Sequence, residues 1–217
     1  KSTTSRLVGA LERHGLLARD PEDGSLLPGP AIDAYARRAR IDPSLNDLAQ
    51  DLLESVATVT GETTTLSVPT PRGVEQIAQA DGAYILGSTN WMGRTVPFHA
   101  SAVGKAMLAF GATALPTGQL ESLTDKTLTI RADLVRDLEA TRQRGYGLSV
   151  EEIEPGLIAI GAPVRGADRR VVAGVAIAGP SVRITPDRYA AIGELLVRTA
   201  DELEARITSH GLEEGAA

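Results

Sequence analysis

The stretch Pro97–Leu108, PFHASAVGKAML, decides the fold, because it joins a strand end, a turn and the start of a helix. Ser101 is a typical capping residue, since its side-chain oxygen accepts from a backbone N–H of the first helical turn. Four residues then follow at the spacing of one apolar helix face: Val103, Ala106, Met107 and Phe110. The small residues at 102–104 let a ligand approach the backbone, where unpaired N–H groups favour an anion.

Two catalytic interpretations of this stretch fail on spacing. Gly104-Lys105 lacks the earlier glycine and the following Ser or Thr of a P-loop. Ser101 and Lys105 are four residues apart, whereas the S-x-x-K hydrolases need three. The alternatives that remain are an ordinary capped core helix and a helix whose N-terminus faces a ligand.

Composition predicts a cytoplasmic protein without a metal or a cofactor. The 217 residues allow one large domain or two small ones, and 42% hydrophobic residues suffice for a core. There is no apolar run of membrane-spanning length, no signal peptide and no cysteine. The three histidines, His14, His99 and His210, show no metal-binding spacing.

Charge is unevenly distributed along the chain. The net charge is −6, but residues 1–41 carry seven basic and five acidic side chains, which gives +2 and leaves −8 for the remainder. A slightly basic start and an acidic body suggest that any polyanionic partner binds at the N-terminal end.

The first residues, KSTTSRLVGALERH, predict a helix that ends near Gly15. Its inward face is expected to contain Thr4, Leu7, Val8 and Leu11. Short strands over 16–19 and 25–27 are expected to form a hairpin. Hydroxyl groups and an arginine at a helix N-terminus suit contacts with phosphates and base edges in a major groove, although an ordinary surface helix with a hairpin has the same pattern.

The rest of the chain predicts an α+β fold with an antiparallel sheet. Helices are expected over 31–40, from Ser44 to Gly61, over 131–144 and from Thr185 onward. Strands are expected over 63–68, 74–79, 84–88, 146–150, 157–164 and 171–179. Asp81-Gly82 is a strong hairpin dipeptide between two of these strands.

One face of the last two predicted strands is made of small residues. Gly174, Ala176 and Ala178 share a face of one strand, and Ala159 and Gly161 share a face of the other, because strand side chains alternate. Such a face leaves room for a ligand, but it equally permits a helix to pack closely.

Two stretches resemble the IclR family of bacterial transcription regulators. PFHASAVGKAMLA is similar to the signature of the family's effector domain, and KSTTSRLVGALERHGLLARD is similar to its recognition helix and wing. The resemblance implies a partial winged helix-turn-helix over 1–28, a linker helix over 29–43 and a GAF-like effector domain over 44–217. Because the chain begins inside the recognition-helix motif, the first two helices of such a DNA-binding domain are expected upstream.

The resemblance also implies the functional residues. The expected DNA contacts are Lys1, Ser2, Thr3, Ser5, Arg6 and Arg19. The expected effector contacts are Ile85, Ser88, Val96, Ala102, Val103, Gly104, Ser149, Leu157, Ala159, Ala176 and Ala178. Family members that sense small oxo-acids often carry Asp, Cys and Ser where this chain has Ser149, Ala159, Ala176 and Ala178. This chain departs from that pattern at all four positions and is less polar there. We therefore expect a small organic acid with an apolar or aromatic body.

The function expected from this resemblance is a ligand-responsive regulator that binds double-stranded operator DNA as a dimer or tetramer. One alternative is a small-molecule sensor or interaction module without DNA binding. Another is an enzyme that uses Glu151, Glu152 and Glu154 beside Ser149, since paired carboxylates can do acid-base chemistry. No nucleophile–base pair accompanies these carboxylates, so we expect no enzyme.

Overall fold

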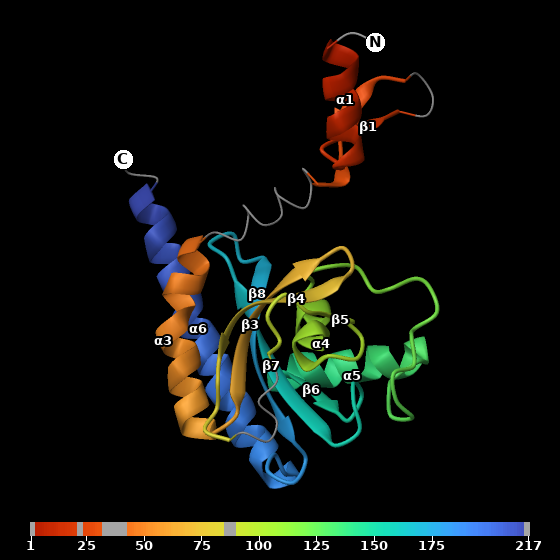
Figure 1. Cartoon of the computed structure of the whole chain (residues 1–217). Coiled ribbons are helices and arrows are strands. Elements are labelled where there is room, and N and C mark those ends of the chain that lie inside the picture. The colour runs from red at the N-terminus through yellow and green to blue at the C-terminus, as the bar shows by residue number, and fades with distance from the viewer. Residues whose placement is uncertain (1–2, 21–23, 32–42, 85–89, 215–217) are drawn as a thin grey trace. The chain divides into compact units, whose positions relative to one another are not determined.

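The computed structural model describes residues 3–20, 24–31, 43–84 and 90–214 (Figure 1). The chain forms two compact units, Lys1–Leu45 and Asn46–Ala217. The expected linker helix falls mostly on residues 32–42, which lie outside the described residues.

The first unit consists of a helix and a hairpin. Helix α1 (Thr3–Arg13) is followed by Gly15 in the left-handed region, with a φ of 68°, and then by the antiparallel strands β1 (Leu17–Arg19) and β2 (Leu26–Pro28). Leu7, expected on the inward face of the helix, is 62% exposed. The expectation is wrong for Leu7 and for the exposed Thr4, whereas Val8 and Leu11, expected on the same face, are half-buried.

The second unit is built on a six-stranded sheet in which all neighbouring strands are antiparallel. The strand order is β5-β4-β3-β8-β7-β6. The bounds are Thr63–Thr70 for β3, Gly73–Ala80 for β4, Thr95–Val96 for β5, Gly147–Val150 for β6, Leu157–Arg165 for β7 and Val171–Pro180 for β8. This confirms the α+β architecture that the sequence predicts.

Helices cover both faces of the sheet. Helices α3 (Pro43–Thr60) and α6 (Tyr189–Glu214) lie on one face, and α4 (Ala102–Ala109) and α5 (Arg131–Arg144) lie on the other (Figure 1). The short helix η1 (Pro186–Arg188) precedes α6. Arg206 joins α6 to α3 through two hydrogen bonds to the Asp51 carboxylate, of 2.6 and 2.9 Å.

Glycines end two of these helices where the pattern predicts. Gly61 follows α3 with a φ of 77°, and Gly145 caps α5 with a φ of 86°. Only glycine adopts this left-handed conformation without steric cost, so the chain can leave each helix sharply and enter the next strand.

The strand expected over 84–88 lies outside the described residues except for Tyr84, and the described part of the hairpin expected at Asp81-Gly82 is not formed. Strand β4 ends at Ala80, Tyr84 is not in a strand, and the next described strand is β5. A Cβ on Gly82 would collide with the backbone of Gly61 and Glu62, and the Ala83 N–H donates to the Gly61 carbonyl at 3.1 Å. Because Gly82 has no side chain, its backbone can lie directly against the turn at Gly61 and Glu62 that follows α3.

None of the helices in the described ranges is both long enough and apolar enough to cross a lipid bilayer.

Candidate functional site

Ser101 caps α4 as its sequence pattern predicts. Its backbone is extended, with φ −92° and ψ 143°, and its Oγ accepts from the Gly104 N–H at 3.2 Å. The same hydroxyl donates to the Pro97 carbonyl at 2.8 Å. The helix start is thus held rigidly against the turn that precedes it.

The helix N-terminus offers two backbone donors, at Ala102 and Val103. The Gly104 N–H is already bonded to Ser101, and a Cβ on Gly104 would lie 2.6 Å from Phe98 Cα. Gly104, expected to contact the effector, therefore packs against its own turn. Within the described part of the chain, the N–H groups of Ala102 and Val103 have no acceptor. An anion at this helix end would bind these two groups.

Helix α4 rests directly on the sheet at three glycines. A Cβ on Gly147 would collide with the Ala102 carbonyl, and one on Gly174 would collide with Val103 Cγ2. A Cβ on Gly161 would lie 2.8 Å from the Val103 backbone nitrogen. The room expected above the small-residue face is therefore filled at Gly161 and Gly174, and the close-packing alternative is correct there.

Beyond the helix, the same face stays partly open. Ser149, Ala159 and Ala178 are cross-strand neighbours on β6, β7 and β8, so their side chains share one face. Ala159, Ala178 and Leu157 are only half-buried, although they lie on a face that α4 covers elsewhere. This region of small and apolar side chains can accept a further apolar group.

Ser149 is the one polar side chain in this row, and its hydroxyl is already used. The side chain is buried, and its Oγ donates to the Ala100 carbonyl at 2.7 Å. This bond fixes the turn before α4 to strand β6. The oxygen keeps its capacity to accept a hydrogen bond from a ligand.

Several other predicted contacts lie in one buried cluster. Val96, Val103 and Ala176 pack together with Val74 and Met107. Trp91 and Ile153 pack against this cluster from the loops that precede β5 and β7. Ala102 is also buried, at 1% exposure. Ile85 and Ser88 lie outside the described residues.

A buried ion pair holds α4 from its other side. The Lys105 ammonium, 1% exposed, lies 2.5 Å from Glu152 Oε1 and 3.0 Å from Asp137 Oδ2. The Glu152 pKa is raised above its usual value, because burial disfavours the carboxylate more than Lys105 stabilises it. These contacts join α4 to α5 and to the turn between β6 and β7.

The carboxylates of the enzyme alternative have structural partners. Glu152 is paired with Lys105, and Glu151 with Lys126 at 2.7 Å. The hydrogen bond from Lys126 lowers the Glu151 pKa. Among the residues with described positions, no group of three or more His, Cys, Asp or Glu side chains is placed to bind a metal ion.

The predicted DNA contacts lie on α1 and the wing. Thr3, Ser5 and Arg6 belong to the first two turns of α1, and Lys1 and Ser2 lie outside the described residues. Arg19 pairs with Glu12 at 2.7 Å and donates to the Gly24 carbonyl at 3.2 Å. Arg19 therefore joins the hairpin to the helix as well as being an exposed cation.

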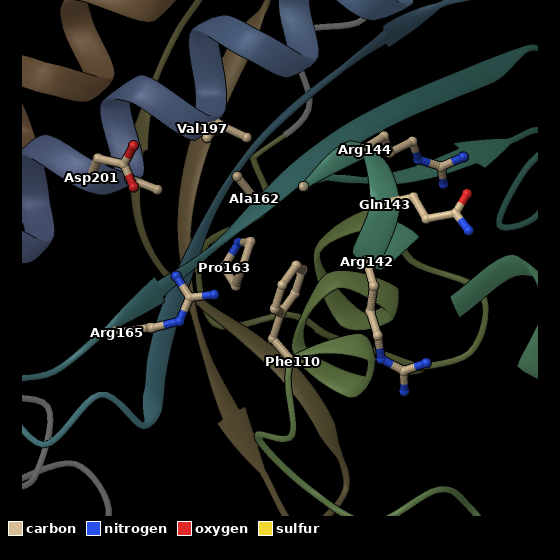
Figure 2. Close-up of a pocket in the computed structure, with 11 residues that line it drawn as sticks. Phe110, Arg142, Gln143, Arg144, Ala162, Pro163, Arg165, Val197 and Asp201 are labelled. Atoms are coloured by element: carbon tan, nitrogen blue, oxygen red, sulfur yellow. The ribbon is translucent and has the colours of Figure 1, made fainter. Parts of the chain in front are cut away.

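A cavity of about 240 Å³ lies away from every predicted contact (Figure 2). Its lining comes from the ends of α4 and α5, from β7 and from α6: Phe110, Arg142, Gln143, Arg144, Gly145, Ala162, Pro163, Arg165, Val197, Ala200 and Asp201. Figure 2 shows the guanidinium groups of Arg142 and Arg144 turned away from Pro163 and Phe110. Arg165 stacks on the Phe110 ring at 5.0 Å and pairs with Glu204 at 3.2 Å. The arginines therefore do not converge on a common ligand.

A row of polar residues that the sequence pattern does not predict as a site lies on the α4 side of β3 and β4. The row contains Thr63, Thr65, Ser67, Gln76 and Gln79. The hydroxyl residues at every second position, Thr63, Thr65 and Ser67, were the available signal, because residues two apart in a strand face the same side.

Comparisons with known proteins point to one family. Residues 42–205 match the family model described as bacterial transcriptional regulator IclR C-terminal. The HTH-type transcriptional regulator BhcR of Paracoccus denitrificans is 32% identical over 211 residues, which cover 93% of this chain and 74% of that protein. The crystal structure of Thermotoga maritima IclR is 26% identical, with a TM-score of 0.71, over 95% of this chain and 86% of that one.

A ligand complex is also among the similar structures. It is the inducer-binding domain of a double mutant of the transcription factor PobR from Acinetobacter, bound to 3-hydroxybenzoic acid. It is 28% identical to this chain, with a TM-score of 0.63, and the match covers 73% of this chain and 96% of that domain.

Proposed function

This chain belongs to the IclR family of bacterial transcriptional regulators, and we propose that it is a ligand-responsive regulator of this kind. Residues 1–28 form part of a winged helix that binds operator DNA. Residues 29–43, most of which lie outside the described residues, would serve as the linker helix, and residues 44–217 form a GAF-like domain that binds a small organic acid. The protein acts in the cytoplasm as a dimer or tetramer, which places two winged helices on a palindromic operator.

The observation that carries the effector half is the arrangement at the start of α4. The N–H groups of Ala102 and Val103 have no described acceptor, and they lie beside a sheet face on which Ala159 and Ala178 are only half-buried. A carboxylate would bind the two N–H groups, where the helix dipole is positive. An apolar body would cover Leu157, Ala159 and Ala178. The complex of the PobR domain with 3-hydroxybenzoic acid supports this class of ligand.

The DNA-binding half is supported by α1 and by the relatives. Thr3, Ser5 and Arg6 occupy the helix turns that contact bases and phosphates in helix-turn-helix proteins. BhcR, which resembles this chain over most of its length, is named an HTH-type regulator.

Regulation requires that the effector bind two states of the protein with different affinity, because a ligand of equal affinity shifts no equilibrium.

The test of the effector site is a substitution that fills the open face. Ala178→Leu should abolish the thermal stabilisation of the protein by aromatic and aliphatic acids while leaving its own melting temperature nearly unchanged. Ala190→Leu, on an exposed position of α6, is the matched control and should preserve acid binding. If no acid stabilises the wild type and Ala178→Leu melts several degrees lower, the face is packed and no such site exists.

A further inference from the structure

Three buried polar atoms on the α4 side of the sheet have no hydrogen-bond partner among the described residues: Ser67 Oγ, Gln76 Oε1 and Trp91 Nε1. Ser67 is fully buried and Gln76 is 5% exposed. Buried polar groups in native proteins are nearly always paired with protein, water or a ligand. Three unpaired atoms on one face therefore call for a partner that is not part of the described chain.

The fold brings Ser67 and Gln76 together and places the loop that carries Trp91 beside them. Ser67 and Gln76 are direct cross-strand partners of β3 and β4, so they share one face. The loop that carries Trp91 is bonded across β4: the Gly93 N–H donates to the Gln76 carbonyl at 2.9 Å, and the Trp91 N–H donates to Gln79 Oε1 at 2.8 Å.

The same face continues into the proposed effector site. Trp91 packs against the cluster that contains Val103 and Ala176. Ser67 is the cross-strand neighbour of Gly174, and Val103 lies directly over Gly174. The unpaired atoms thus lie on the same face of the sheet as the α4 N-terminus, beyond the contact of Val103 with Gly174.

We propose that Ser67, Gln76 and Trp91 form an uncharged subsite that binds a hydroxyl group of the effector. Trp91 Nε1 donates, Gln76 Oε1 accepts, and the Ser67 hydroxyl does both. A ligand hydroxyl also donates and accepts, so it satisfies all three atoms. A carboxylate has no proton for Gln76 Oε1, and the cation at this place, Arg94, is stacked on the Trp91 ring with its guanidinium 5.6 Å from the ring centre. The subsite rests on the proposed function, because it assigns one end of the same ligand.

The distance between the two ends limits the ligand. Val103 lies over Gly161 of β7, whereas Ser67 is on β3, which is two strand spacings or about 10 Å away across the sheet and two residues or about 7 Å further along it. A two- or three-carbon acid is too short to bind at both ends. The geometry therefore selects a hydroxylated acid whose hydroxyl and carboxylate stand at opposite ends of an apolar body.

The experiment is calorimetric titration with acids that differ only by a terminal hydroxyl. The pairs are benzoate with 4-hydroxybenzoate, and hexanoate with 6-hydroxyhexanoate. In the wild type, the hydroxylated member of at least one pair should bind about three- to tenfold more tightly. Ser67→Ala and Gln76→Met should remove that preference and keep the affinity for the unhydroxylated acid. Thr64→Val, buried on the opposite face of β3, is the control and should keep the preference.

Melting temperature gives an independent readout. Removal of an unpaired buried hydroxyl should leave the ligand-free protein as stable as the wild type or more stable, so Ser67→Ala should not melt lower. A lower melting temperature of Ser67→Ala together with an unchanged preference for the hydroxylated acids would mean that the three polar atoms bind an internal water molecule. That result would overturn the subsite. Equal affinity for both members of every pair would overturn the subsite alone. Failure of every acid to bind would overturn the effector half of the proposed function as well.

Discussion

The ammonium group of Lys105 and the carboxylate of Glu152 lie 2.5 Å apart in the interior, although 47 residues separate them in the chain. Lys105 is on the helix whose N-terminus we propose binds the effector. Glu152 is on the turn between β6 and β7, and β7 begins at the half-buried Leu157. The pair therefore sets the position of α4 relative to the sheet face on which the ligand would lie.

We expect Lys105→Met to be destabilised by about 3–5 kcal/mol near pH 7.5, because it leaves Glu152 buried without its cation. Burial already raises the Glu152 pKa, and loss of Lys105 should raise it further. The folded state then binds more protons than the unfolded state, whose glutamate titrates near 4.5, so stability falls as pH rises above that value. Part of the loss should return at pH 5, as measured by urea unfolding at both values.

The double variant Lys105→Met with Glu152→Gln is the control for this prediction. It removes both charges, so it should be more stable at pH 7.5 than Lys105→Met alone and should show little of the pH dependence. An equal loss of stability at pH 5 and pH 7.5 in the single variant would contradict the assignment of the effect to Glu152.

Gly161→Ala should be destabilised by about 1–3 kcal/mol or more, because its new Cβ would meet the Val103 backbone rather than a movable side chain. Gly118→Ala is the matched control. Its Cβ would meet nothing within 4 Å, and its φ lies outside the left-handed region. That substitution should be neutral or slightly stabilising. Thermal unfolding of the two variants side by side decides whether α4 rests on the sheet as described.

Arg6→Ala should weaken binding of the intact regulator to its operator by about 1–3 kcal/mol if Arg6 contacts a base. If Arg6 contacts only phosphate, the loss should be similar on operator and on random DNA. Gel-shift titrations of both proteins on both duplexes, at fixed salt, separate these cases. Unchanged affinity on both would remove Arg6 from the interface and favour a sensor without DNA binding.

Affinity for unbranched acids should rise with chain length by about 0.8 kcal/mol for each added CH₂, until the open face is filled. The reason is that the proposed lining offers methyl groups at Ala159 and Ala178 and a half-buried Leu157. Titration of butanoate, pentanoate and hexanoate measures the increment. A flat series would mean that the acids bind at the surface rather than along this face.

The sequence by itself determined the elements whose signals are local. The cap at Ser101, the left-handed ends at Gly61 and Gly145, and the alternation of β7 and β8 all depend on residues within one or two turns of each other. Such signals act through the chain's own dihedral angles and nearest hydrogen bonds, so they can be recognised without knowing the fold.

Only the tertiary structure decided which surfaces are filled and which stay open. Gly161 was compatible both with room for a ligand and with a closely packed helix, and the backbone of α4 lies there. Gly82 predicted a hairpin turn, but it lies against the turn at Gly61. The pairing of Lys105 with Glu152 and the unpaired oxygens of Ser67 and Gln76 depend on contacts between distant segments. Such contacts arise from the packing of helices on a sheet, and no periodicity along the chain encodes them.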